Sequence, residues 1–287
     1  MHWPLMTVVL LAFALIASTA LASESAQAAR QESKKPHVVF VTGDHEYESE
    51  VTMPMIARIL EERHGMKCTV LYAVDETGER NPHYEKNIPG LEALATADLM
   101  VMYVRFRVLP DDQLRMILDY VKDGRPVIGL RTSTHAFLYR EGPHVRWNDD
   151  FGRDVFGQKW IRHHGGNSTT RVDVMLADHP ITRGIDPTFH GRSWLYHVIP
   201  LHGDCVPLLN GTAVQGLEAD GPIFGTPSPV AWTKTYRGGR VFFTTLGHIE
   251  EFAETPMRRL LVNGIYWALG KEADIPAGGC NVEPVEP

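Results

Sequence analysis

The feature that most constrains this chain is an alternation of short apolar runs with amphipathic helical segments in its first half. The apolar runs are typical of buried strands and cover residues 37–42, 68–72, 98–104 and 126–130. Helical periodicity separates them at residues 53–64 and after Pro110. Such alternation favours a parallel sheet with helices on both faces. The sequence therefore predicts an α/β fold with a doubly wound, mainly parallel sheet.

The second half of the chain is less regular. Residues 139–170 are rich in Gly, His, Asn and Trp, and we expect them to form a lid or wall. Strand-like pieces return at residues 171–176, 206–209, 229–236 and 240–245. Because Arg237-Gly238-Gly239 separates the last two, they are predicted to pair as a hairpin extension. A closing helix is expected at 255–269, followed by a C-terminal tail at 271–287.

The amino-terminal segment has the pattern of a secretory signal peptide. Residues 1–22 lack Asp, Glu, Lys and Arg, and residues 8–17 form an apolar run that is short for a bilayer span. Small residues favour cleavage after Ala22, with cleavage after Ala28 as the second candidate. We therefore predict a signal peptide at 1–22, a linker at 23–36 and an exported protein, periplasmic or secreted, without stable membrane insertion. An uncleaved membrane anchor is the alternative.

Composition limits the partners and the redox chemistry. The 287 residues carry a formal net charge of −7 without a Lys/Arg-rich run, which argues against nucleic-acid binding. Cys68, Cys205 and Cys280 are too few for a disulfide framework, although a Cys205–Cys280 bridge is conceivable. The oligomeric state is left open. The 14 histidines are the unusual feature, and they direct attention to imidazole chemistry.

Polar residues follow three of the predicted strands, at the sheet edge where ligands of doubly wound folds bind. The strand-end sequences are Gly43-Asp44-His45-Glu46, Arg105-Phe106-Arg107 and Arg131-Thr132-Ser133-Thr134-His135. A buried arginine needs a partner, so at least one of these arginines is expected to pair with Asp44, Glu46 or Glu250. The first turn lacks the further glycines of a dinucleotide site, so no nucleotide cofactor is expected.

Several segments resemble signatures of the ThuA-like (trehalose-utilisation) family. They are residues 43–45 (GDH), 129–137 (GLRTSTHAF), 178–184 (DHPITRG), 229–232 (PVAW), 239–248 (GRVFFTTLGH) and 258–265 (RRLLVNGI), in family order. The resemblance covers residues 37–270. It implies a flavodoxin-like domain of the class I glutamine amidotransferase type, linked to sugar utilisation.

In amidotransferases a cysteine nucleophile occupies the sharp turn after a central strand. The resemblance places that turn at Thr132-Ser133-Thr134, and no cysteine lies near it. The sequence therefore does not favour a cysteine-dependent glutaminase. Ser133 or Thr134 could be a nucleophile only with a base beside it. The other interpretation is that these hydroxyls cap the following helix and bind ligand oxygens.

His248-Ile249-Glu250 matches the His-x-Glu spacing of the amidotransferase triad. A carboxylate that orients an imidazole fixes its tautomer and raises its basicity. We therefore predict that His248 is catalytic and that Glu250 orients it, with Glu251 and Glu254 as alternative partners. A loop histidine without a catalytic role is the other interpretation.

His45, His135 and His248 follow strands whose ends can be neighbours. Three converging imidazoles could bind a divalent transition metal such as zinc, completed by Asp44, Glu46 or water. They could equally act as catalytic acids or bases toward a bound sugar. No His-x-x-x-His or Cys-x-x-Cys spacing decides between these hypotheses.

Further candidates for substrate binding surround these histidines. Arg105 and Arg131 could hold ligand oxygens, together with Ser133, Thr134, Asp44 and Glu46. Aromatic rings could stack on the apolar face of a sugar, and the candidates are Trp160, Trp147, Trp194 and Tyr196. His163 and His164 are adjacent, so at most one of them faces the site in an extended segment. We assign that role to His164.

The expected function is that of an exported enzyme of carbohydrate utilisation. It would hydrolyse or isomerise a disaccharide or a keto-sugar derivative at a His-rich crevice. The alternative is a non-catalytic sugar-binding domain that kept the fold after losing its cysteine nucleophile. A small carbohydrate is the expected ligand in both cases.

Overall fold

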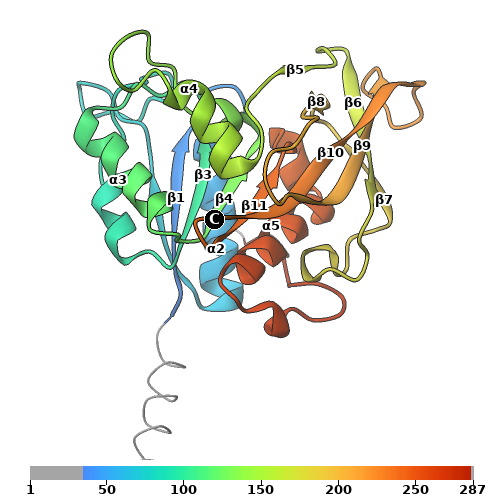
Figure 1. Ribbon diagram of the computed structural model, residues 1–287. Coiled ribbons are helices and arrows are strands. Elements are labelled where there is room, and N and C mark those ends of the chain that lie inside the picture. Colours follow the sequence, from blue (N-terminus) through green and yellow to red (C-terminus); the bar gives the residue numbers. More distant parts are fainter. Residues whose placement is uncertain (1–34, 286–287) are drawn as a thin grey trace, which may run out of the picture. The chain divides into compact units, whose positions relative to one another are not determined.

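Residues 35–285 are described by the computed structural model (Figure 1). The described residues from Pro36 onward form one compact unit. The predicted signal peptide at 1–22, and the predicted linker at 23–36 apart from its last two residues, lie outside the described residues. Within residues 35–285, no helix has both the length and the apolar character needed to cross a membrane.

A nine-stranded sheet forms the centre of this unit, with strand order β2-β1-β3-β4-β11-β10-β9-β6-β7 (Figure 1). The parallel strands are β2 (Lys67–Leu71), β1 (His37–Gly43), β3 (Leu99–Val104), β4 (Val127–Leu130) and β11 (Gly239–Thr244). This is the order of a flavodoxin-like sheet, whose winding direction reverses between β1 and β3. The predicted doubly wound, mainly parallel α/β fold is therefore confirmed.

Helices cover both faces of the parallel strands, because successive strand residues point to opposite faces. Val38 and Phe40 of β1 belong to a core cluster with α2 (Ser49–His64) and α5 (Thr255–Ala268). Val39 and Val41 belong to a second cluster with α3 (Asp111–Lys122). The central strands β3 and β4 lack polar side chains and are fully buried for this reason.

Four strands extend the sheet in antiparallel fashion beyond β11. They are β10 (Ile223–Tyr236), β9 (Val206–Gln215), β6 (Ser168–Val174) and β7 (Thr188–Gly191). The predicted hairpin is confirmed as the antiparallel pair of β10 and β11. The extension is larger than that hairpin, because β9, β6 and β7 continue the same sheet.

The long stretch 139–170 contains short elements that lie against the strand ends. They are α4 (Trp147–Asp150), a helical continuation at Phe151–Val155, and β5 (Arg162–His163), which pairs with β8 (Tyr196–His197). Gly152 permits a close approach to the turn after β4. A Cβ at this position would lie 2.1 Å from the carbonyl oxygen of Thr134. The stretch is thereby packed tightly against the end of β4.

The C-terminal residues differ from the predicted tail at 271–287. The side chains of Cys280 and Val282 are buried in the core. The Asn263 side chain of α5 accepts a hydrogen bond from the Cys280 backbone N–H at 3.0 Å. The proline and glycine residues of this segment correctly indicated irregular backbone, but they did not predict that Cys280 and Val282 are buried. Cys280 and Cys205 are both free, so the conceivable bridge is not formed.

Candidate functional site

A narrow cavity of about 70 Å³ lies where the chain leaves the carboxyl ends of β1, β3 and β4. We call it the strand-end cavity. Its walls are formed by Glu46, Tyr47, Arg105, Phe106, His135, Trp160, His163 and Tyr196. The set includes four residues that the sequence assigns to the site, namely Glu46, Arg105, His135 and Trp160. The rule that ligands bind at the ends of parallel strands is therefore a good guide to its position.

Asp44 shapes the turn after β1. Its carboxylate is buried and accepts hydrogen bonds from the backbone N–H groups of Glu46 at 2.7 Å and Tyr47 at 3.1 Å. The Thr132 hydroxyl donates to its other oxygen. Burial raises the pKa of Asp44, and these hydrogen bonds oppose that shift. Asp44 thus directs Glu46 and Tyr47 into the cavity and does not line it.

Arg105 joins two residues of that turn. One terminal nitrogen donates to Nε2 of His45 at 2.9 Å, and the other forms an ion pair with Glu46 at 2.9 Å. The expected arginine–carboxylate pair is thereby confirmed. Burial and the charge of Arg105 lower the pKa of His45, which is therefore neutral at pH 7. His45 supports Arg105 from behind and does not line the cavity.

The sharp turn after β4 is occupied by Arg131, one residue before the turn that the sequence indicates. Arg131 has φ of 40°, a left-handed conformation that is costly for a residue with a side chain. Its buried guanidinium donates to the Thr245 carbonyl at 2.7 Å and to the Tyr47 hydroxyl at 3.0 Å. It also lies over the rings of Tyr47 and Tyr196. Arg131 therefore holds the cavity wall and contacts no cavity space itself.

Ser133 and Thr134 do not have the ligand-binding role that the sequence predicts for them. The Ser133 hydroxyl donates to the Met102 carbonyl at 2.8 Å, and Thr134 Oγ1 lies 3.2 Å from the Arg131 carbonyl and 3.0 Å from Nδ1 of His135. Both side chains are fully buried. They brace the turn against β3 and are not placed to attack or bind a ligand.

His135 presents its imidazole to the cavity. The side chain is only 9% exposed, and its ring centroid lies 5.0 Å from that of Phe106 and 5.6 Å from that of Trp160. Burial, reinforced by nearby Arg105 and Arg131, lowers its pKa to about 3. The ring is therefore neutral at pH 7. Because Thr134 engages Nδ1, Nε2 is the nitrogen available to a ligand.

The wall opposite β4 comes from Trp160 and β5. Trp160 lies at the rim with 40% of its side chain exposed. His163 lines the cavity, whereas His164 turns away, where its Nδ1 contacts the Leu195 carbonyl and its ring stacks on His197. One of the two adjacent histidines faces the cavity, as expected, but it is His163 and not His164. The sequence predicts that adjacent side chains of this extended segment point in opposite directions. Which of the two histidines faces the cavity depends on how β5 pairs with β8.

The loop after β11 does not contain the predicted His–Glu side-chain pair. The Glu250 carboxylate forms an ion pair with Arg192 at 2.9 Å. Nδ1 of His248 instead accepts the backbone N–H of Glu250 at 3.3 Å. His248 lies edge-on to the Tyr47 ring, with centroids 6.1 Å apart, and is not part of the cavity wall. Glu250 turns outward because Arg192 gives its charge a partner at the surface.

Glu251, the alternative partner, organises this loop through the backbone. Its buried carboxylate accepts the backbone N–H groups of Gly247 at 2.6 Å, His248 at 3.0 Å and Ser193 at 2.7 Å. The Ser193 hydroxyl lies 3.0 Å from the same carboxylate. Glu251 therefore ties the loop after β11 to the segment before β8, which supplies Tyr196 to the cavity.

The predicted metal ligands do not form a ligand set in the structure. Within residues 35–285, no three His, Cys, Asp or Glu side chains are grouped so as to hold a metal ion. Arg105 donates to Nε2 of His45, which occupies the lone pair that a metal would need. His135 lines the cavity, whereas His248 does not. The arrangement thus gives the predicted zinc-like ion no support.

Tyr47, Phe106 and His163 line the cavity although the sequence assigns them no role, and the stacking candidate Tyr196 lines it as well. Each of the first three adjoins an assigned residue along the chain, so a wider window at the strand ends would have included them. Tyr196 comes from β8, which no periodic pattern marks. Only the pairing of β8 with β5 brings it to the site.

Comparison with known proteins agrees with this fold. A ThuA-like protein from Parabacteroides merdae is 18% identical with a TM-score of 0.58, over 82% of this chain and 90% of that one. A ThuA-like protein from Bacteroides uniformis is 17% identical with a TM-score of 0.55, over 82% and 93%. No curated protein matches the chain. The family model for ThuA, described as trehalose utilisation, matches residues 37–268, and the chain therefore belongs to the ThuA family.

Proposed function

We propose that this protein acts in carbohydrate utilisation and isomerises a keto-sugar derivative in the strand-end cavity. The observation that carries the proposal is the meeting of a carboxylate, a neutral imidazole and a guanidinium in one aromatic-walled space. These groups belong to Glu46, His135 and Arg105. Membership of a trehalose-utilisation family supports a sugar as the substrate class.

The aromatic walls suit a sugar ring. Phe106 and Trp160 flank His135 with ring centroids 5.0 and 5.6 Å from it. Aromatic faces bind the apolar faces of pyranoses, while a few polar groups fix orientation. The Tyr47 hydroxyl, hydrogen-bonded to Glu46 at 3.1 Å, is one such polar group. Trp160 at the rim would receive the part of the ligand that remains outside the cavity.

Isomerisation next to a carbonyl needs a base and a hydrogen-bond donor, and the cavity has both. The Glu46 carboxylate takes the proton from the carbon beside the carbonyl, and the released electron pair moves onto the carbonyl oxygen. Nε2 of neutral His135 carries a proton and donates to that oxygen in the tautomer whose Nδ1, 3.0 Å away, accepts from the Thr134 hydroxyl in place of the Arg131 carbonyl. The hydroxyl proton on the first carbon moves to the former carbonyl oxygen, so that the first carbon becomes the new carbonyl. Glu46 returns its proton to the former carbonyl carbon, and atoms and electrons balance.

Arg105 supports this step in two ways. Its ion pair at 2.9 Å holds the Glu46 carboxylate in place. Its charge also helps to keep His135 neutral, since it lowers the pKa of that imidazole. Arg105 Nε–H is buried without a partner in the described residues, so an acceptor oxygen brought beside it would gain a hydrogen bond.

Hydrolysis of a glycosidic bond fits the cavity less well. Most glycosidases use two carboxyl groups that flank the bond, one as acid and one as base or nucleophile. Glu46 supplies the one carboxylate of the described cavity wall, because Asp44 is buried behind it. Neutral His135, with a pKa of about 3, is a poor general acid near pH 7.

Export is part of the same proposal, on the basis of the apolar run at residues 8–17 and the small residues before position 23. The alternative function is non-catalytic sugar binding. One observation favours it, namely the small volume of the cavity, about 70 Å³. This is well below the several hundred Å³ typical of small-molecule sites, so only part of a sugar would enter.

The experiment is isomerisation in D₂O, followed by NMR with a panel of keto-sugars. We expect deuterium at the carbon beside the carbonyl, together with formation of the isomer. Glu46→Gln and His135→Phe should each reduce the rate by about 100-fold or more, which is the usual contribution of a general acid or base. Glu48→Gln, an exposed carboxylate outside the cavity wall, is the matched control. Sugar binding without exchange in the unmodified protein would establish the binding function instead.

A further inference from the structure

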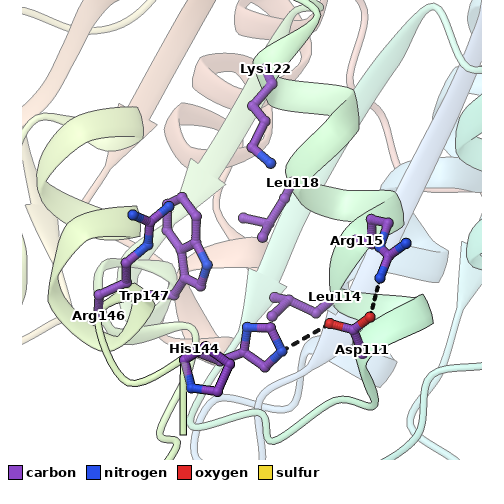
Figure 2. Close-up of a pocket in the computed structure, with 9 residues that line it drawn as sticks. Asp111, Leu114, Arg115, Leu118, Lys122, His144, Arg146 and Trp147 are labelled. Atoms are coloured by element: carbon purple, nitrogen blue, oxygen red, sulfur yellow. Dashed lines mark hydrogen bonds and ion pairs between the residues drawn. The ribbon is translucent and has the colours of Figure 1, made fainter.

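A second cavity, of about 370 Å³, lies between α3 and the segment that leads into α4 (Figure 2). We call it the α3 groove. None of the residues that line it belongs to the wall of the strand-end cavity. Its volume is within the range of small-molecule sites. Neither the proposed reaction nor the sequence motifs make use of it.

The α3 groove has an apolar stacking surface. Leu114 and Leu118 of α3 are buried beneath it. The indole of Trp147 faces Leu118 across the space (Figure 2). The Arg146 guanidinium lies 4.3 Å from the centroid of that indole and holds the ring in place. An aromatic ring facing aliphatic side chains suits the flat apolar face of a pyranose.

The rim of the groove is positively charged in a chain whose formal net charge is −7. Arg115, Lys122 and Arg146 line it, and Asp111 is the single carboxylate among the lining residues. That carboxylate is already bound by Arg115 and, at 3.0 Å, by Nε2 of His144. Lys122 has a distant exposed partner outside the groove in Asp119 at 3.6 Å.

Arg146 is the cation with the most binding capacity left. Among the described residues it forms no ion pair within 4.0 Å, and its ring contact leaves the guanidinium N–H groups available. A carboxylate on a ligand that stacks in the groove would lie in a space lined by both Arg146 and Lys122. A neutral ligand would gain only the stacking contact.

We propose that the α3 groove binds an acidic saccharide, a uronate-containing glycan, through stacking on Trp147 and ion pairing with Arg146 and Lys122. Charge complementarity selects an anionic ligand, and the indole with its aliphatic floor selects a flat, partly apolar one. The site is separate from the reacting cavity. It would hold the protein on an acidic polysaccharide while the strand-end cavity acts on its own substrate.

The test is isothermal titration of the mature protein with an oligogalacturonate and with a neutral malto-oligosaccharide of equal length. We expect the oligogalacturonate to bind at least about tenfold more tightly. Trp147→Ala and Arg146→Gln should each weaken that binding by about tenfold or more. Lys67→Gln removes a comparable exposed charge at the start of β2 and serves as the matched control.

Two outcomes would overturn the proposal. One is equal binding by the Trp147→Ala, Arg146→Gln and control variants, which would show general attraction without a site. The other is equal affinity for inorganic phosphate and oligogalacturonate, which would show that the groove recognises negative charge and not the saccharide. Because the groove and the cavity share no residue, Glu46→Gln should leave oligogalacturonate binding unchanged. Failure here is therefore distinguishable from failure of the proposed isomerisation.

Discussion

The strand-end cavity and the charged residues behind it use polar side chains in opposite ways. Behind the wall, Arg131 and Glu251 are buried, and their side chains form hydrogen bonds with other groups of the protein. We call these two residues the supporting pair. In the wall, His135 keeps Nε2 available and Trp160 is 40% exposed. The comparison separates residues that hold the site from residues that can act on a ligand.

The largest expected effect is on Arg131. Arg131→Ala removes a fully buried side chain, leaves the Thr245 carbonyl without its donor, and takes the cation from between two tyrosine rings. We expect the free energy of unfolding to fall by about 3–5 kcal/mol. Urea denaturation measures it, with the surface substitution Arg171→Ala as control at about 0–1 kcal/mol. Equal stability of the two variants would contradict the conclusion that Arg131 stabilises the fold behind the cavity wall.

Glu251 and Glu250 are adjacent carboxylates with opposite surroundings. Glu251→Ala leaves the backbone N–H groups of Gly247 and Ser193 without an acceptor, whereas the N–H of His248 keeps the Ser193 hydroxyl oxygen at 3.1 Å. It should therefore lower the free energy of unfolding by about 3 kcal/mol. Glu250→Ala removes only an exposed ion pair with Arg192 and should cost about 0–1 kcal/mol. Thermal denaturation of both variants measures the two losses of stability. A larger loss for Glu250→Ala would contradict the conclusion that Glu251 is the structural carboxylate of this loop.

Acid pH should reveal the buried, neutral state of His135. The imidazole has a pKa of about 3 in the folded protein, against an ordinary value of 6.5. Below pH 6.5 this imidazole becomes protonated in the unfolded chain but stays neutral in the folded protein. Stability is therefore lost as pH falls, by up to about 1.4 kcal/mol per unit from this residue. His135→Gln should show a shallower decline in urea unfolding between about pH 6.5 and pH 4.5. Identical slopes would contradict the assignment.

The smallest expected effect on stability is at Trp160. Because its side chain is partly exposed at the rim, Trp160→Ala should change the free energy of unfolding by less than about 1 kcal/mol. Loss of aromatic stacking should weaken sugar binding by up to about tenfold. Trp160→Phe, which keeps a ring, should recover part of the affinity in a titration. A stability loss as large as that of Arg131→Ala would place Trp160 with the supporting pair.

Much of the fold could be predicted from the sequence because its signals are local. Continuous apolar runs indicated strands buried on both faces, and turn residues between residues 236 and 240 indicated the β10–β11 hairpin. The strand ends also located the cavity, since topology alone brings the ends of β1, β3 and β4 to one edge. The additional strands β9, β6 and β7 were partly visible as apolar pieces, but their common sheet was not.

The roles of individual site residues could not be predicted in the same way. Arg131 points inward because Tyr47, Tyr196 and Thr245, from three distant segments, surround its guanidinium. Glu250 turns outward because Arg192 lies at the surface beside it. These directions depend on partners far apart in the chain, and no spacing in the sequence records them. A family-like His-x-Glu spacing was therefore insufficient to identify a side-chain pair.

The burial of the C-terminal residues has a practical consequence for anyone who divides this chain. The family match ends at residue 268, yet Cys280 and Val282 fill the core beyond it. The carbonyl of Val282 accepts a hydrogen bond from buried Arg258 of α5 at 2.9 Å. A fragment cut at the family boundary would expose that helix and leave its polar groups without partners. In this protein the limit of homology is not the limit of the folding unit.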